Sequence, residues 1–333
     1  MIREEKMVTW ENILGHEENI SRLKLMLEEN RLPHALLFYG LEGIGKRQVA
    51  KALAAALLCD EKNICGRCPS CLAMKSGNHP DFYEIVPEIR GKSSRIIRIE
   101  TIREMEKETA RLPVLSKCRV VIIDDADTMN ESAQNALLKT LEEPTGEMYF
   151  ILVTSVRDSL LNTIISRSIP FSFKPLETGL IFKALEKDNI MPEEAKKIAS
   201  LADGSLGRAY YLANEGIELR DDAAKFLLSL DTMPKDNLFE LGKNLGDLTK
   251  EKLGEWLFFL LLILRDELAL YEGGTFIYNA DLRSNLTKNI ELFSRKRLFS
   301  LIKLVIEQQR RLNANVNLRL LAEAFIIKAQ NTK

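Results

Sequence analysis

One short glycine-rich segment restricts the fold of this chain more than any other feature. Residues 40–47 read GLEGIGKR and lie between the apolar run HALLF and the helical pattern VAKALAAALL. The frame G-x-x-x-x-G-K between a strand and a helix is typical of a phosphate-binding loop (P-loop), in which backbone N–H groups and a helix N-terminus face phosphate oxygens. The sequence therefore predicts a P-loop fold whose phosphate-facing residues are Gly40, Gly43, Gly45 and Lys46.

The residues expected to handle a metal ion depart from this frame. Arg47 stands where a P-loop normally has the Ser or Thr hydroxyl that holds Mg²⁺. Asp124 ends the apolar run VVIID, the place of the acid that orients Mg²⁺, and Asp125 follows where a longer Glu would act on water. A base misplaced by about 1 Å costs on the order of a hundredfold in rate. We therefore expect lost hydrolysis, while bound ATP or ADP and a loop kept only for packing both stay open.

The order of elements indicates an α/β region followed by an all-α region. Apolar runs at 35–40, 118–124 and 148–155 predict buried parallel strands, and 46–58 predicts a helix. Asn130 is placed to cap a further helix that stops before Pro144. From about residue 176 the patterns are helical. We expect a nucleotide-binding-like domain at 1–175, a small helical lid domain at 176–240 and a helical oligomerisation domain at 241–333.

Composition favours a soluble intracellular protein. The chain has 333 residues, 46% of them hydrophobic and 29% charged, which is enough apolar material for several cores. The first residues show no signal peptide, and the nine-residue run 256–264 is too short for a bilayer span and predicts a buried helix. The net charge of −1 means that any DNA contact depends on a local basic face. We expect a cytoplasmic location.

Four of the five cysteines form a cluster with spacing C-x5-C-x2-C-x2-C. Thiolates at this density fit a tetrahedral structural zinc, and disulfides are uncommon in the cytosol. The expected ligands are Cys59, Cys65, Cys68 and Cys71, in a module at 59–71. The fifth, Cys118, begins a buried strand and is expected to be a small core residue.

Two arginines are candidates for phosphate contacts. Arg167 follows the third strand in TIISRS, a place suited to an arginine finger that reaches a neighbour's γ-phosphate. The triplet alone favours an ordinary surface salt bridge. Arg208 in DGSLGRAYYL can reach a phosphate from the lid domain or merely cap its own helix.

Several motifs together carry a family resemblance from about residue 10 to about residue 326. They are RLPHALLFYGLEGIGK, the cysteine cluster, NHPDFYEI, RIETIRE, VVIIDDADTMNESAQNALLKTLEEP, LLNTIISRS, DGSLGRA and NANVNLRLLAEAF. The chain resembles the clamp-loader branch of the AAA+ family, and within it the delta-prime subunits of bacterial DNA polymerase III. The resemblance implies a RecA-like AAA+ domain with an inserted zinc module, a three-helix lid and a helical collar domain.

The same resemblance separates this chain from gamma/tau subunits, which carry GKT and an Asp-Glu pair. Here the motifs are GKR and Asp124-Asp125. Two departures remain from the delta-prime pattern: the first cysteine gap is five residues instead of eight, and the finger triplet is Ser166-Arg167-Ser168 instead of Ser-Arg-Cys.

The function implied is that of a stator in the DNA polymerase III clamp loader, one that supplies an arginine finger and has no intrinsic ATPase. The implied partners are the gamma/tau and delta subunits, and through the complex the sliding clamp (beta) and primed DNA. The alternatives are a gamma/tau-type ATPase, disfavoured by Arg47 and Asp125, and a stand-alone zinc-containing DNA-binding module, disfavoured by the near-neutral charge.

Overall fold

The computed structural model describes residues 8–90, 94–290, 293–312 and 316–332. The chain forms two compact units. The first contains the described residues of Met1–Ile89 with Arg95–Ala195 and Gly204–Tyr210, and the second contains those of Arg90–Ser94, Lys196–Asp203 and Tyr211–Lys333. The three-domain division at residues 175 and 240 stays a prediction.

The first unit is built around a parallel sheet of order β2-β5-β6-β1-β7. Its strands are β1 (Ala35–Tyr39), β2 (Phe82–Ile85), β5 (Arg119–Ile123), β6 (Met148–Thr154) and β7 (Ile169–Ser172), and a separate pair is formed by β3 (Glu88–Arg90) and β4 (Ser94–Ile96). The three predicted strands are confirmed to within a residue at each end. The edge strands β2 and β7 were not predicted.

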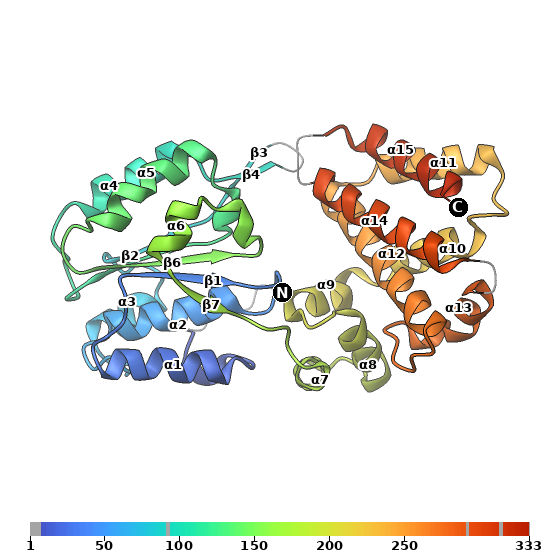
Figure 1. Ribbon diagram of the computed structural model, residues 1–333. Coiled ribbons are helices and arrows are strands. Elements are labelled where there is room, and N and C mark those ends of the chain that lie inside the picture. Colours follow the sequence, from blue (N-terminus) through green and yellow to red (C-terminus); the bar gives the residue numbers. More distant parts are fainter. Residues whose placement is uncertain (1–7, 91–93, 291–292, 313–315, 333) are drawn as a thin grey trace. The chain divides into compact units, whose positions relative to one another are not determined.

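Helices cover both faces of this sheet, so its central strands are apolar on both sides. One core joins Leu36, Phe38, Val120 and Ile122 to α1 (Glu17–Glu28) and α2 (Lys46–Leu58). The other joins Leu37, Val121 and Phe150 to α4 (Ile99–Thr109), α5 (Glu131–Glu142) and α6 (Asn162–Arg167). Figure 1 shows the two groups of helices on opposite faces. The short helix α3 (Pro69–Lys75) follows the cysteine-containing loop.

The ends of helices α2 and α5 lie where the neighbouring residues predicted them. The predicted helix at 46–58 coincides with α2, and the Asn130 side chain accepts a hydrogen bond from the N–H of Ala133 at the start of α5. Helix α5 ends at Glu142, before Pro144. Cys118 is buried in the core beside β5, as predicted.

Beyond β7 every described element is helical. They are α7 (Thr178–Lys187), α8 (Pro192–Leu201), α9 (Leu206–Glu215), α10 (Glu218–Ser229), α11 (Lys235–Gly246), α12 (Lys250–Tyr271), α13 (Arg283–Ile290), α14 (Arg295–Leu312) and α15 (Leu318–Asn331), with a short 3₁₀ helix at Ala280–Leu282. Further 3₁₀ helices lie earlier in the described chain, at Trp10–Asn12, Ala126–Thr128 and Arg157–Ser159. The predicted fold class, α/β followed by all-α, is confirmed.

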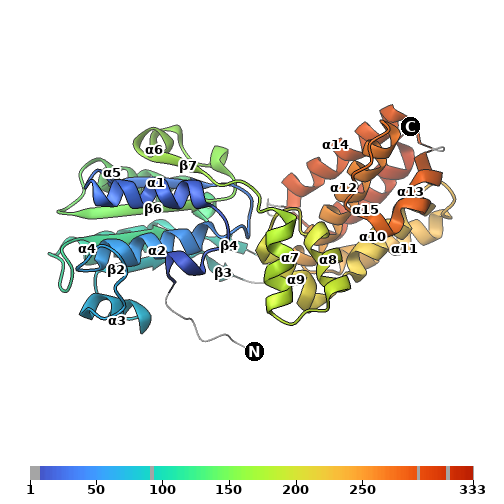
Figure 2. The same ribbon diagram turned by 90° about the horizontal axis from the view of Figure 1, so that it is seen from below.

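The second unit is organised around α12, which packs against α10, α13 and α14 (Figure 1 and Figure 2). The apolar run 256–264 lies in this helix and is largely buried, as predicted. Trp256 contacts Phe226 and Phe325, with ring centroids 5.4 and 6.0 Å away. In the part of the chain that the structure describes, no helix has both the length and the apolar character to cross a membrane.

Candidate functional site

The loop between β1 and α2 has the backbone form of a P-loop. Gly40, Gly43 and Gly45 have φ values of 151°, 74° and 102°, conformations that side chains rarely adopt. A Cβ on Gly40 would lie 2.4 Å from the carbonyl oxygen of Phe173, and one on Gly43 would lie 2.5 Å from Ser205 Oγ. The glycines are therefore required by the backbone path and by close neighbours.

Lys46 begins α2 and turns its ammonium group back onto the loop. Its Nζ donates hydrogen bonds to the carbonyls of Gly40 at 2.9 Å and Leu41 at 2.7 Å. The side chain is 6% exposed, and this burial lowers the pKa of Lys46 from its usual value. To meet a phosphate, the ammonium group must exchange these two carbonyls for phosphate oxygens.

Arg47 lies beside the acids expected to face a metal ion. Its Nε donates to Glu84 Oε1 at 2.7 Å and lies 3.4 Å from Asp124 Oδ2. Lys51, one turn further along α2, places Nζ 3.2 Å from Glu84 Oε2. The structure thus brings Arg47 and Asp124 together as the motif implied, and it adds two residues that sequence reasoning missed, Glu84 and Lys51.

The pKa directions follow from these contacts. Burial by itself would raise the pKa of Glu84, but the hydrogen bond and charge of Arg47, with Lys51, outweigh it and lower that pKa. For Asp124 the balance is opposite: burial, followed by the charge of Asp125, raises its pKa against the effect of Arg47.

The other polar groups at the carboxyl end of the sheet are also paired. Asp125 has a left-handed backbone, with φ 46°, and its Oδ2 lies 2.9 Å from an Arg95 nitrogen. Thr154, at the end of β6, donates through Oγ1 to Asp127 Oδ1 at 2.6 Å. Neither Asp127 nor Thr154 was predicted as a site residue. Asp127 lies in the turn after β5 and Thr154 ends β6, so both lie at the carboxyl edge of the sheet, where parallel sheets place their ligand sites.

The start of α9 packs directly on the P-loop. Ser205 Oγ donates to the carbonyl of Glu42 at 2.8 Å, and the N–H of Gly207 donates to the carbonyl of Gly43 at 2.8 Å. The N–H of Arg208 donates to Ser205 Oγ at 3.2 Å, which caps the helix. The structure therefore places Arg208 in the first turn of a helix that touches the loop.

Arg167 is the last residue of α6, far from its own P-loop. In the register of β1 and β7, Leu36 pairs with Ile169 and Tyr39 with Ser172. Arg167 therefore lies at the amino edge of the sheet, while the P-loop leaves the carboxyl edge. Its guanidinium donates to the Thr163 carbonyl at 3.1 Å and forms an ion pair with Glu142. The side chains of Arg167 and Glu142 are 37% and 49% exposed.

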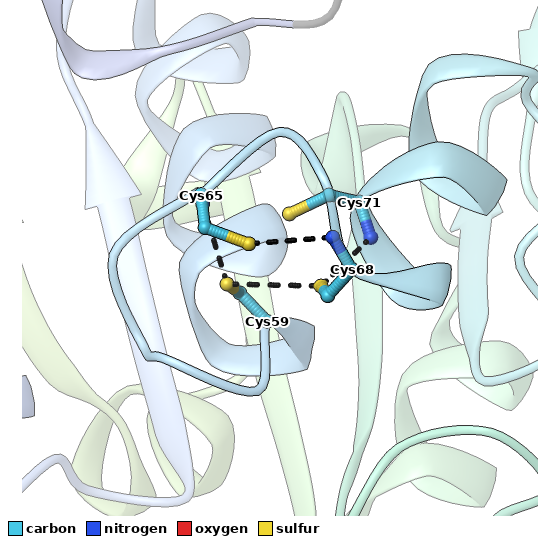
Figure 3. A group of neighbouring side chains, drawn as sticks. All are labelled: Cys59, Cys65, Cys68 and Cys71. Atoms are coloured by element: carbon cyan, nitrogen blue, oxygen red, sulfur yellow. Dashed lines mark hydrogen bonds between the residues drawn. The ribbon is translucent and has the colours of Figure 1, made fainter.

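The four predicted zinc ligands come together on one small module. Their sulfur atoms all lie within 4.8 Å of one another, and Figure 3 shows them facing a common centre. Cys59 follows α2, Cys68 caps α3 and Cys71 lies in its first turn. The Sγ atoms of Cys59 and Cys68 are 3.9 Å apart, against about 3.8 Å for two thiolates of a tetrahedral zinc.

Backbone donors surround these sulfurs as they do in thiolate clusters. The N–H groups of Cys65, Cys68 and Cys71 each lie 3.4 Å from the sulfur of the preceding cysteine in the cluster. Hydrogen bonds from Arg67 and Cys68 lower the pKa of the Cys65 thiol to about 7, while burial raises the pKa of Cys71. The group can hold a metal ion, and the short first gap does not prevent the sulfurs from converging.

The motif NHPDFYEI has a structural role that the sequence did not reveal. The buried carboxylate of Asp81 accepts the N–H groups of Val114, Leu115 and Ser116 at 2.7–2.8 Å. These contacts hold the loop that leads to β5. Arg119, which is 3% exposed, lies 3.6 Å from Asp81 and donates to carbonyls at the end of α4 and in the loop after it.

Comparison with known proteins identifies the family of this chain. The family model described as "DNA polymerase III, delta subunit" matches residues 15–177. The DNA polymerase III subunit delta' of Bacillus subtilis is 30% identical over 332 residues, covering 97% of this chain and 99% of that protein. The chain belongs to the delta-prime family of DNA polymerase III subunits.

Two further similarities are to a tau/gamma subunit and to a protein of solved structure. The DNA polymerase III subunit tau/gamma of Haemophilus influenzae is 32% identical over 271 residues, which cover 74% of this chain and 38% of that one. A gamma subunit-related protein of Thermotoga maritima, known from its crystal structure, aligns over 94% of this chain and 99% of its own, with 17% identity and a TM-score of 0.43.

Proposed function

We propose that this delta-prime family member is the stator of a clamp loader, assembled with gamma/tau and delta subunits, that places the sliding clamp (beta) on primed DNA. The full-length similarity to subunit delta' carries this proposal. The similarity to tau/gamma is of comparable identity but covers 38% of that longer protein. The second compact unit, built on α12, supplies the helical domain through which such subunits would associate.

The stator does not hydrolyse ATP by itself. A P-loop ATPase needs a hydroxyl at the Mg²⁺ position and a correctly reaching acid beside the strand-end Asp. In this chain Arg47 contacts Asp124 and Glu84, and Asp125 is held by Arg95. These contacts disfavour the gamma/tau-type alternative.

Arg167 acts as an arginine finger on a neighbouring subunit. Its position at the amino edge of the sheet rules out its own P-loop as a target, because the loop leaves the opposite edge. The ion pair with Glu142 is partly exposed, and such a pair is worth about 0–1 kcal/mol. A γ-phosphate offers more negative charge, so the guanidinium can exchange partners at small cost.

The module at 59–71 holds one structural Zn²⁺ through Cys59, Cys65, Cys68 and Cys71. All four protein ligands are thiolates, which leaves no open position for catalysis. When bound, the ion links the end of α2 to the start of α3 and contributes folding free energy to the module.

The decisive experiment reconstitutes the loader with Arg167→Ala and measures clamp- and DNA-stimulated ATPase. A finger contributes about 10³–10⁵ at its own site, so the contribution of the bordering site should vanish while the subunit still assembles. Arg31→Ala is the matched control, since Arg31 is an exposed arginine paired with Glu29 at 3.3 Å. Unchanged hydrolysis and clamp loading in assembled Arg167→Ala complexes would refute the finger.

A further inference from the structure

The metal position of the P-loop is filled by part of the protein itself. A hydroxyl after the P-loop lysine and an acid at the end of a neighbouring strand normally hold Mg²⁺ on a nucleotide. In this chain Arg47 stands at the position of the hydroxyl residue, and Asp124 is the acid. The Nε atom of Arg47 lies 3.4 Å from Asp124 Oδ2. The residues present therefore do not fit a divalent ion.

The charges around Asp124 balance without a metal. Glu84 and Asp124 are 20% and 14% exposed and carry two negative charges; Arg47 and Lys51 supply two positive ones. Arg47 contacts both acids, at 2.7 and 3.4 Å, and Lys51 contacts the second oxygen of Glu84 at 3.2 Å. A divalent ion entering this group would find its ligands already neutralised and a fixed cation beside it.

The elements that carry these residues hold them in place. Arg47 and Lys51 lie one turn apart on α2, Glu84 lies in β2, and Asp124 follows β5, the strand paired with β2. In the register of that pair, Glu84 lies opposite Ile122. The guanidinium is thus held between two adjacent strand ends by a helix packed on the same sheet, and no loop rearrangement is needed to form the contact.

We propose that Arg47 is a tethered cation that replaces the divalent ion, so that the P-loop of this chain excludes Mg²⁺ and admits a nucleotide only without metal. The proposal goes beyond a loss of ATP hydrolysis, because it assigns the exclusion of Mg²⁺ to the Arg47 side chain. It also predicts that replacing Arg47 restores a metal-binding site. It deepens the proposed stator function, but its test uses the isolated full-length chain and does not depend on the finger at Arg167.

The experiment titrates Mn²⁺, as a probe for Mg²⁺, into the zinc-loaded full-length chain with ADP present and follows free Mn²⁺ by electron paramagnetic resonance. Wild type should bind no more Mn²⁺ than Asp124→Asn. Arg47→Thr should gain one Mn²⁺ per chain, with affinity about tenfold or more above wild type, because a unit charge is removed from the ligand group. The double variant Arg47→Thr with Asp124→Asn should lose that ion again.

Arg47→Lys is the matched control, since it keeps the charge and should still exclude Mn²⁺. Thermal unfolding of each variant establishes that it is folded, and Arg47→Ser provides a second hydroxyl variant. An Asp124-dependent Mn²⁺ site in wild type would overturn the proposal. Folded Arg47→Thr and Arg47→Ser proteins that gain no Mn²⁺ would overturn it as well. Failure here would leave the loader ATPase result with Arg167→Ala untouched.

Discussion

Replacing Glu267 by Gln should stabilise the second compact unit at pH 8 and flatten its dependence on pH. Glu267 lies in α12 and is 0% exposed. Asn289 Nδ2 donates to its Oε1 at 2.5 Å, while Oε2 has no hydrogen-bond partner among the described residues. Burial raises the pKa of this carboxyl group from 4.5 to about 7.

The sign and size of the effect follow from that shift. Between pH 4.5 and about 7 the folded protein keeps a proton that the unfolded chain releases, so stability falls as pH rises through this window. Above the window the charged form is buried at a cost of about 3 kcal/mol, at 1.4 kcal/mol for each pH unit. Gln resembles the protonated form and can still accept the Asn289 hydrogen bond, so the variant avoids most of this cost.

Urea unfolding at pH 5, 6, 7 and 8 measures the prediction. Trp256 is fully buried in the same helix and reports on this unit, and a Trp10→Phe background removes the other tryptophan of the chain. Glu251→Gln, at an exposed position of α12, is the control and should leave the slope unchanged. A Glu267→Gln protein with the wild-type slope between pH 5 and 8 would refute the reasoning.

Three further outcomes are expected. Asp81→Ala should cost about 3–5 kcal/mol of unfolding free energy, because it leaves Arg119 buried without its acid; a loss below 1 kcal/mol would contradict this role. Elemental analysis of the wild-type protein should find one zinc per chain, and Cys68→Ser should lose both the metal and thermal stability. Wild-type protein that is as stable without zinc as with it would count against the zinc module. ATP turnover by the isolated chain should stay at background and be unaffected by Lys46→Ala; hydrolysis that Lys46→Ala abolishes would establish an enzyme instead.

Sequence patterns located the elements whose signals are local. The helix after the glycine loop, the Asn130 cap and the three central strands are each specified by neighbouring residues, and the structure confirms them. The strands β2 and β7 were not predicted because each has only four residues and lies at an edge of the sheet. Pro170 within β7 further weakens the strand signal, although proline is tolerated on an edge strand.

The contacts that define the site, in contrast, join residues that are far apart in the sequence. Arg47 and Glu84 are 37 positions apart, and they meet because β2 is added beside β5 at the sheet edge. Nothing in the spacing of the sequence singles out Glu84 among the 48 acidic residues as the partner of Arg47. The convergence of the cysteines could be predicted for the opposite reason, since all four lie within one short segment.

The glycines of the P-loop therefore carry less information about nucleotide binding than their motif suggests. Gly40 is required because Phe173 passes close to it, and Gly43 because the start of α9 packs on it; both neighbours are parts of the protein itself. A chain that gave up nucleotide entirely would still need these glycines to hold β1, α2 and α9 together. The residue after the lysine is more informative, because the guanidinium of Arg47 contacts Asp124, the acid that a metal ion would need.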